Sequence, residues 1–317
     1  MKVLITGATG FIGRQVVSRL CAAGFDIRIA SRQQQRLADA VDAVTLPGVD
    51  APDPAFLALM QDVSHVVHCA ALNSDRRASD ADYMAANATL TGRLAQAAAA
   101  GSGGRFVYLS SIRAVAGPGF SGTIDEATPA VPQDAYGRSK REGEIRMLAA
   151  YAAAGRADAT ALRLPPVYGK GMKGNMKALM RLADTALPLP SSALTGVRSL
   201  ISADAVADAV LHILTTSTPL RPVYIASDSL PIAMSEIVIA FRQGFGRPPR
   251  LFPTLPLPLR LAATLLGKRA SWQGLAANQI CDASLLASEG WMPEADTLGR
   301  LRQLARRLKR GALLSLL

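Results

Sequence analysis

The sequence predicts an α/β fold built on a doubly wound parallel sheet, followed by a smaller C-terminal lobe. Six short apolar segments, at residues 3–6, 26–30, 43–46, 65–69, 105–109 and 160–164, alternate with helical stretches, several of them rich in alanine. This alternation is typical of parallel strands joined by crossover helices. A glycine triplet follows the first segment, and after Tyr168 glycines and prolines break the pattern into short elements. With 317 residues and 50% hydrophobic content, the chain can form one α/β unit with an added lobe.

The glycine triplet predicts a dinucleotide site. The chain opens with MKVLITGATGFIG, in which an apolar strand ends before Gly7, Gly10 and Gly13, and a helix is expected at residues 14–23. Glycines let the backbone approach a pyrophosphate closely, and the helix N-terminus offers unpaired amides and partial positive charge. A glycine triplet alone is a weak signal. Its place between a strand and a helix makes dinucleotide binding the favoured interpretation.

Tyr136 and Lys140 form a second candidate site. They stand four residues apart, one helical turn, about 25 residues after the pair Ser110-Ser111. A fixed cation beside a phenol lowers the cost of ionising it, so we expect Tyr136 to exchange a proton near neutral pH. The plain alternative is an amphipathic helix with an exposed lysine. The glycine motif favours hydride chemistry on an alcohol or ketone instead.

Five ordered motifs resemble those of the extended short-chain dehydrogenase/reductase family of sugar-nucleotide epimerases, dehydratases and reductases. They are TGATGFIG, His68-Cys69-Ala70-Ala71, Ser110-Ser111, Tyr136 to Lys140, and Leu162 to Gly169, and the likeness runs from Met1 to about Pro293. The resemblance implies a Rossmann domain at residues 1–168, rejoined at about 200–228. It also implies a substrate-binding lobe made of residues 169–199 and 229–317.

The resemblance also implies residue roles. Tyr136 would exchange the proton at the reacting oxygen, Ser111 would hydrogen-bond the same oxygen, and Lys140 would bind the nicotinamide ribose. Asn175 and Arg198 would bind substrate, Arg198 matching the family arginine that pairs with phosphate. The implied cofactor-binding residues are Gly7, Thr9, Gly10, Phe11, Ile12, Gly13, Ser31, Arg32, Val49, Cys69, Ala70, Ala71, Asn87, Tyr136, Lys140, Pro165 and Val167.

The end of the second strand bears on the choice of cofactor. Cofactors without a 2′-phosphate are usually held there by an acidic residue, whereas the phosphorylated form needs cations. The chain has Ser31 and Arg32 at this point and no acid. We therefore expect NADP(H), with NAD(H) as the alternative if Arg32 is merely a solvated loop residue. Val49 stands where relatives often carry an aspartate near the adenine.

The residues after Ser111 narrow the reaction. Dehydratases of the family place an Asp-Glu pair there, and this chain has Ile112 and Arg113, so dehydration is disfavoured. The late segments most resemble the UDP-glucose 4-epimerase-like subgroup. The resemblance implies an enzyme reducing a UDP-4-keto-6-deoxy-N-acetylhexosamine for O-antigen and lipopolysaccharide synthesis. The alternatives are a UDP-sugar 4-epimerase with bound NAD and a non-catalytic cofactor-binding sensor.

Charge and composition bear on partners. The net charge of +11 reflects 35 basic and 24 acidic residues, several of the basic ones near an apolar C-terminal end. A solvated terminal helix is favoured over one lying on an anionic membrane, and no motif indicates specific nucleic-acid binding. Three separate cysteines without a signal peptide favour the cytoplasm, and no residues show metal-ligand spacing. From the resemblance, alanine-rich helices at 81–100 and 135–154 would form a homodimer.

Overall fold

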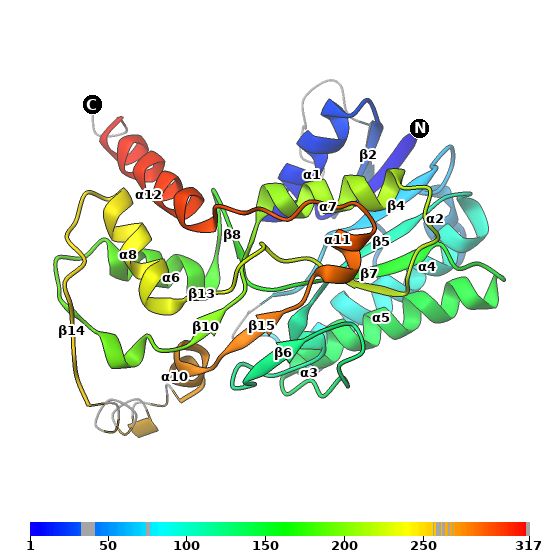
Figure 1. Ribbon diagram of the computed structural model, residues 1–317. Coiled ribbons are helices and arrows are strands. Elements are labelled where there is room, and N and C mark those ends of the chain that lie inside the picture. The colour runs from blue at the N-terminus through cyan, green and yellow to red at the C-terminus, as the bar shows by residue number, and fades with distance from the viewer. Residues whose placement is uncertain are drawn as a thin grey trace.

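The computed structural model of the chain describes residues 1–32, 42–73, 77–255 and 269–314, together with 257, 261, 264, 265 and 267. A seven-stranded sheet lies at its centre, in the order β12-β7-β5-β4-β1-β2-β3, and every neighbouring pair is parallel. This confirms the predicted doubly wound Rossmann sheet (Figure 1). Its strands are β1 (Lys2–Thr6), β2 (Asp26–Ser31), β3 (Asp42–Thr45), β4 (His65–His68), β5 (Phe106–Ser111), β7 (Ala159–Leu164) and β12 (Val223–Ile225).

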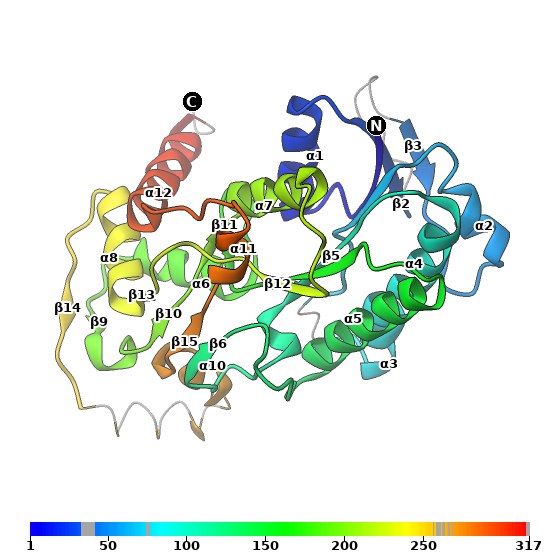
Figure 2. The same cartoon turned by 45° about the vertical axis from the view of Figure 1, so that its right-hand side comes forward.

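Helices cover both faces of the sheet, which explains why β4, β5 and β7 are buried along their whole length. One apolar cluster packs beneath α1 (Phe11–Ala22), α7 (Ala203–Thr215) and α11 (Ser284–Ser288). A second cluster packs beneath α2 (Asp53–Ala58), α4 (Leu90–Gly101) and α5 (Ala135–Ala153). Figure 2 shows α4 and α5 side by side on the face opposite α1 and α7. The short α3 (Asp80–Met84) also contacts α5.

A smaller lobe stands beside the carboxyl ends of the strands and has an apolar core of its own. Its helices α6 (Gly174–Ala183), α8 (Met234–Gly244) and α12 (Thr297–Leu314) gather at the left of Figure 1. A second sheet runs in the order β13-β10-β15-β6. The other strands are β6 (Gly122–Ile124), β8 (Val167–Tyr168), β9 (Leu189–Pro190), β10 (Val197–Arg198), β11 (Ile201–Ser202), β13 (Ile232–Ala233), β14 (Leu251–Phe252) and β15 (Gln279–Cys281). Helix α10 (Arg269–Ala276) and two 3-10 turns, Ile112–Ala114 and Ser191–Ala193, are also present.

The chain passes between sheet and lobe more than once. After the first lobe segment it returns through α7 to β12, an edge strand of the sheet. Asp228 follows β12 and is only 2% exposed. Its carboxylate accepts hydrogen bonds from Tyr168 Oη (2.9 Å) and Thr297 Oγ1 (2.7 Å), so it joins the sheet side to the first turn of α12. The division into 1–168 with 200–228, and 169–199 with 229–317, stays a proposal.

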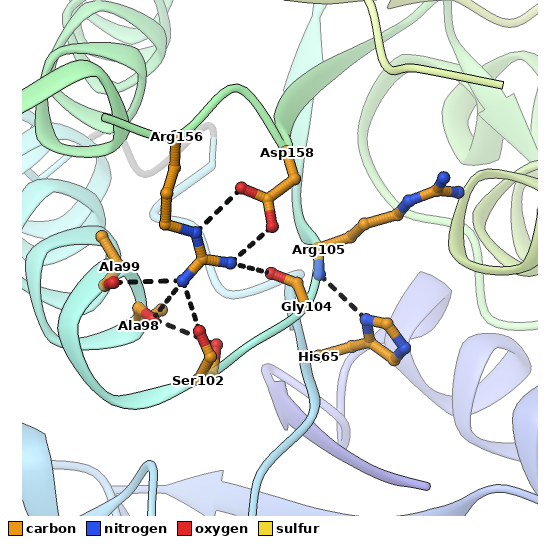
Figure 3. A network of polar contacts seen from close by, with 8 residues as sticks. All are labelled: His65, Ala98, Ala99, Ser102, Gly104, Arg105, Arg156 and Asp158. Carbon is orange, nitrogen blue, oxygen red and sulfur yellow. Dashed lines mark hydrogen bonds and ion pairs between the residues drawn. The ribbon is translucent and has the colours of Figure 1, made fainter. Parts of the chain in front are cut away.

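Arg156 joins several segments at the amino ends of the strands, the end of the sheet away from the smaller lobe (Figure 3). Its guanidinium pairs with Asp158 at the start of β7 and donates to carbonyls of Ala99 (3.1 Å) and Gly104 (2.6 Å), at and beyond the end of α4. Last-turn carbonyls have no partner within their own helix, so a cation there satisfies them. Nearby, His65 Nδ1 accepts from Arg105 N (2.9 Å). These contacts hold neighbouring elements of the fold together, and we assign them a structural role.

Candidate active site

The glycine loop between β1 and α1 is shaped for close backbone approach. Gly7 has φ +69°, and a side-chain Cβ there would stand 2.5 Å from the backbone nitrogen of Ala70. A Cβ on Gly13 would collide with the carbonyl oxygen of Gly7. Helix α1 begins at Phe11, three residues earlier than the sequence predicts, because Gly10 is its N-cap and closes a tight turn onto Gly7 O (2.9 Å). No side chain caps this end, so its amides are available to a pyrophosphate.

The remaining loop positions lie around this turn. Phe11 and Ile12 are half-buried in the first turn of α1, and the carbonyl of the half-buried Thr9 accepts from Arg14 Nε (3.0 Å). The residues after β4, Cys69 and Ala70, are half-buried beside Gly7, and Ala71 is exposed. These positions fit a dinucleotide phosphate that needs a backbone-lined cradle.

Tyr136 and Ser111 are brought together by α5 and β5. Tyr136 lies in the first turn of α5, where Asp134 is the N-cap and accepts from Gly137 N (2.7 Å). Gly137 permits this arrangement, since a Cβ there would strike the backbone of Arg113. Ser111 ends β5, and its side chain is close enough to Tyr136 to act on the pKa of the phenol. The ring of Tyr83, from α3, packs edge-on against Tyr136 at 6.4 Å.

The pKa of Tyr136 differs from the sequence expectation. Burial raises it to about 12, the Ser111 hydrogen bond acts against this, and the charge of Asp134 adds to it. The expected lowering by Lys140 is wrong for this arrangement. The Lys140 ammonium donates to the carbonyl of Leu109 (2.7 Å) and lies 4.1 Å from the centre of the Tyr108 ring, so it is engaged elsewhere. Tyr136 therefore keeps its proton at neutral pH and is suited to donating it.

Lys140 is 1% exposed, one helical turn after Tyr136. Burial lowers its pKa to about 7, while the charge of Glu144 acts in the opposite direction. Beneath it, His68 stacks on Tyr108 at 5.4 Å, and burial together with Lys140 lowers the pKa of His68 to about 3. His68 is thus a neutral ring held by Thr6 and Thr91, as expected of a packed histidine.

Asn87 supports the loop after β4 from within a π-helical turn, Ala85–Thr89, between α3 and α4. Its amide group donates to Leu72 O (3.0 Å) and Ser139 Oγ (2.9 Å), and its Oδ1 accepts from Leu72 N (2.8 Å). The wide turn also frees its carbonyl, which accepts from Tyr108 Oη (2.9 Å). Such turns often occur at functional sites. Asn87 positions the loop and is fully buried.

Sequence reasoning missed a buried ion pair behind the site. Adjacent residues of a strand point to opposite faces, and Ser110 accordingly points away from Ser111 and donates to Glu144 (2.6 Å). Arg163, on β7, holds the same carboxylate through two bonds. The four-residue spacing of Tyr136, Lys140 and Glu144 was the available signal. The two arginine bonds could not be foreseen, because they depend on the pairing of β5 with β7.

The residues expected at the adenosine end of the cofactor are more exposed than those expected at the nicotinamide end. Ser31 ends β2, and the exposed Arg32 follows it with no ion pair to any other described residue. Val49 is half-buried, and its carbonyl accepts from Arg93 (2.6 Å). At the other end, Pro165 is buried and Val167 is half-buried in β8, directly after β7.

On the lobe side, Arg198 lies in β10, and one of its terminal nitrogens donates to Gly274 O (2.5 Å). Its Nε is buried with no hydrogen-bond partner among the described residues. Burial and the charge of Arg113 lower its pKa. An unsatisfied guanidinium near a second cation fits an anionic ligand. Asn175 is exposed in the first turn of α6, and no hydrogen bond joins it to Arg198 or to any other residue that the structure describes.

Two further kinds of feature are absent from the described part of the chain. No three or more His, Cys, Asp or Glu side chains gather there in a way that could hold a metal ion. None of the helices in those ranges combines the length and apolar character needed to cross a membrane.

Comparisons with known proteins agree with this geometry. The model of the NAD dependent epimerase/dehydratase family matches residues 3–225. The chain is 28% identical over 304 residues to a UDP-glucose 4-epimerase of Vibrio cholerae, covering 92% of this chain and 90% of that protein. It is 30% identical over 228 residues to a dTDP-6-deoxy-L-talose 4-dehydrogenase (NAD(P)(+)) of Kitasatospora kifunensis, covering 66% and 69%.

Solved structures share the fold. A UDP-N-acetylglucosamine 4-epimerase from Bacillus cereus superposes with a TM-score of 0.78 at 21% identity, covering 98% of this chain and 100% of that one. The UDP-glucose 4-epimerase of Thermus thermophilus, in complex with NAD, gives a TM-score of 0.75 at 21% identity with the same coverage.

Proposed function

Because the chain belongs to the NAD dependent epimerase/dehydratase family, we propose that it moves a hydride between a nicotinamide cofactor and C4 of a UDP-linked sugar. It is an NAD(P)-dependent enzyme of the extended short-chain dehydrogenase/reductase type that acts on sugar nucleotides. The observation that carries the proposal is the meeting of Ser111, Tyr136 and Lys140 at the carboxyl end of β5. The complete set argues against a non-catalytic sensor.

The chain's own residues supply position and a proton. A nicotinamide cofactor bound along the Gly7 to Gly13 turn would supply or accept the hydride. Tyr136 gives its phenolic proton to the oxygen on C4 in the reducing direction and takes it back in the other. Ser111, whose side chain acts on the pKa of Tyr136, would hydrogen-bond the same substrate oxygen. Lys140, as an ammonium ion one helical turn away, would bind the nicotinamide ribose.

We propose reduction as the net reaction, with a UDP-4-keto-6-deoxy-N-acetylhexosamine for lipopolysaccharide synthesis as the substrate. The pKa of Tyr136, raised to about 12 by burial, supports a proton donor at neutral pH. The exposed Arg32 and the lack of an acid at the end of β2 support an exchangeable NADP(H). NAD(H) remains the alternative cofactor, and the Thermus thermophilus neighbour is in complex with NAD.

The second candidate is a UDP-sugar 4-epimerase, because the Vibrio cholerae epimerase matches 92% of the chain. One experiment separates the two. The purified protein is incubated with UDP-glucose, UDP-N-acetylglucosamine and an enzymatically prepared UDP-4-keto-6-deoxy sugar, with and without NADPH. A reductase consumes one NADPH for each 4-keto sugar and leaves the hexoses unchanged. Epimer formation without added cofactor would overturn the reductase assignment.

We also propose a homodimer that pairs the outer faces of α4 and α5. Small side chains and two arginines line a groove between these helices, among them Gly92, Gln96, Ala99, Arg146, Ala149 and Ala153. Small residues permit close helix packing. Light scattering at micromolar concentration should give twice the chain mass, and Ala149→Glu should give the monomer mass. A wild-type monomer would refute the dimer. Three unpaired cysteines suit the cytoplasm as the proposed location.

A further inference from the structure

Glu144 is a buried carboxylate at a junction of three elements. It is 0% exposed on α5. Ser110 Oγ (2.6 Å) and Arg163 Nε (3.0 Å) donate to its Oε1. Arg163 Nη2 (2.8 Å) and Arg141 Nη1 (2.9 Å) donate to its Oε2. The carboxylate is thus fully satisfied by two strands and by its own helix.

Stability alone is a weak reason for this arrangement. Removing two charges from water costs several kcal/mol per ion, and well-packed apolar residues often serve as well or better. The ion pair nevertheless lies between α5 and the neighbouring strands β5 and β7, which are buried from end to end. A role connected to the neighbouring site accounts for its position.

The bonds of Glu144 reach each part of that site. Glu144 follows Lys140 by one helical turn, so both lie on the face of α5 that meets the sheet. Ser110 directly precedes Ser111, and Arg163 stands two residues before Pro165. At Gly143, an added Cβ would stand 2.7 Å from Tyr108 Oη, so the helix has no room to shift.

Glu144 is also the anion that acts on Lys140. The other titratable groups near the lysine are His68 at the end of β4, Cys69 directly after it, Tyr108 of β5 and Tyr136 of α5. Burial lowers the pKa of His68 to about 3 and raises that of Cys69 to about 12, so both are neutral at pH 7. Burial raises the pKa of both tyrosines. Arg141 and Arg163 pair with the same carboxylate and partly offset its charge.

We propose that Glu144 is a positioning residue for the reaction: it fixes α5 against β5 and β7 and keeps Lys140 in its ammonium form. The proposal rests on the proposed function, because it assigns Glu144 to the chemistry of Tyr136, Lys140 and Ser111. A merely structural residue would leave the charge state of Lys140 unchanged.

The test compares Glu144→Gln and Glu144→Asp with wild type. The protonation of Lys140 is followed by NMR of ¹³Cε-labelled lysine in the cofactor-free protein, and Lys140→Met assigns the signal. Loss of the opposite charge should lower the midpoint of the Lys140 titration in Glu144→Gln by about 1 pH unit. If turnover follows the ammonium fraction, the ratio of turnover at pH 8 to turnover at pH 6 should then fall about 5-fold. Asp208→Asn removes the same charge from the exposed ion pair with Arg19 and should change neither.

Glu144→Asp keeps the charge but shortens the side chain. Its Lys140 midpoint should stay near that of wild type, while turnover falls at every pH because α5 loses its register. If Glu144→Gln fails to fold, a Lys140 midpoint in Glu144→Asp well below the wild-type value would overturn the proposal. An unchanged midpoint and pH profile in folded Glu144→Gln would do the same. The NMR titration needs no substrate, so it stands even if UDP-sugars prove not to react.

Discussion

The two walls of the candidate site are built differently. On the sheet side, Lys140 and Asn87 are buried and each bonds to other parts of the protein. On the lobe side, Arg198 keeps a buried nitrogen without a partner among the described residues, and Asn175 is exposed. The polar side chains of the first wall have their hydrogen-bond partners within the protein, whereas the second wall leaves polar groups to which a ligand can bond. Changes to the first wall should therefore alter turnover, and changes to the second should alter affinity.

The sharpest test of this contrast is Tyr136→Phe. Removing a positioned acid should lower turnover by roughly 100- to 10,000-fold. The packing of the ring against Tyr83 is kept, so cofactor affinity and melting temperature should stay close to wild type. Steady-state kinetics and cofactor titration check both parts. Turnover near the wild-type level would mean that another group delivers the proton.

Arg198→Ala tests the lobe wall. If Arg198 binds the diphosphate through charged hydrogen bonds worth about 1.5 to 3 kcal/mol, UDP should bind about 10- to 150-fold more weakly. Isothermal titration with UDP measures this, and cofactor binding should be unaffected. Arg181→Ala, at an exposed position of α6, serves as the control. If Arg198→Ala lowered turnover but left the affinity for UDP unchanged, the lobe wall would not be the part of the site that sets affinity.

Arg32→Ala tests the adenosine end. If Arg32 pairs with a 2′-phosphate, NADPH should bind about 10- to 150-fold more tightly than NADH in wild type, and the variant should lose most of that preference. Fluorescence titration of both cofactors decides it. Equal affinities in wild type, or an NADH preference that the variant retains, would assign NAD(H) instead.

Asp228, which bonds to residues on both sides of the site, should affect stability in a pH-dependent way, and not turnover or affinity. Burial raises its pKa to about 6, although bonds from Thr297 and Tyr168 oppose this. The folded protein therefore binds the proton more tightly than the unfolded chain does. Stability from this group is present below about pH 4 and is lost as pH rises through about 6, by about 3 kcal/mol in all. Relative to wild type, Asp228→Asn should gain stability between pH 4 and 7 in urea unfolding, whereas Asp50→Asn, at an exposed position, should not.

The sheet could be predicted from sequence because its strands are apolar runs between glycines and helices, and the structure keeps each within a few residues of its expected bounds. The lobe could not, since strands such as β9 and β14 have two residues and show no periodicity. In the candidate site, the four-residue spacing predicted that Tyr136 and Lys140 lie on one helix, as they do in α5. It could not give the pKa of Tyr136, because burial outweighs the neighbouring charges. Nor could it give the bond from Arg163 to Glu144, which depends on strand pairing.

The π-helical turn at Ala85–Thr89 limits how this gene can change length. Helical residues rotate by about 100° each, so deleting one residue here would turn α4 by that angle relative to α3. Asn87 could then keep its bonds to Leu72 and Ser139, or Leu94 and Ala98 could stay in the core, but not both. Single-codon deletions should be selected against, and an alignment gap placed inside the turn would signal a different active-site loop.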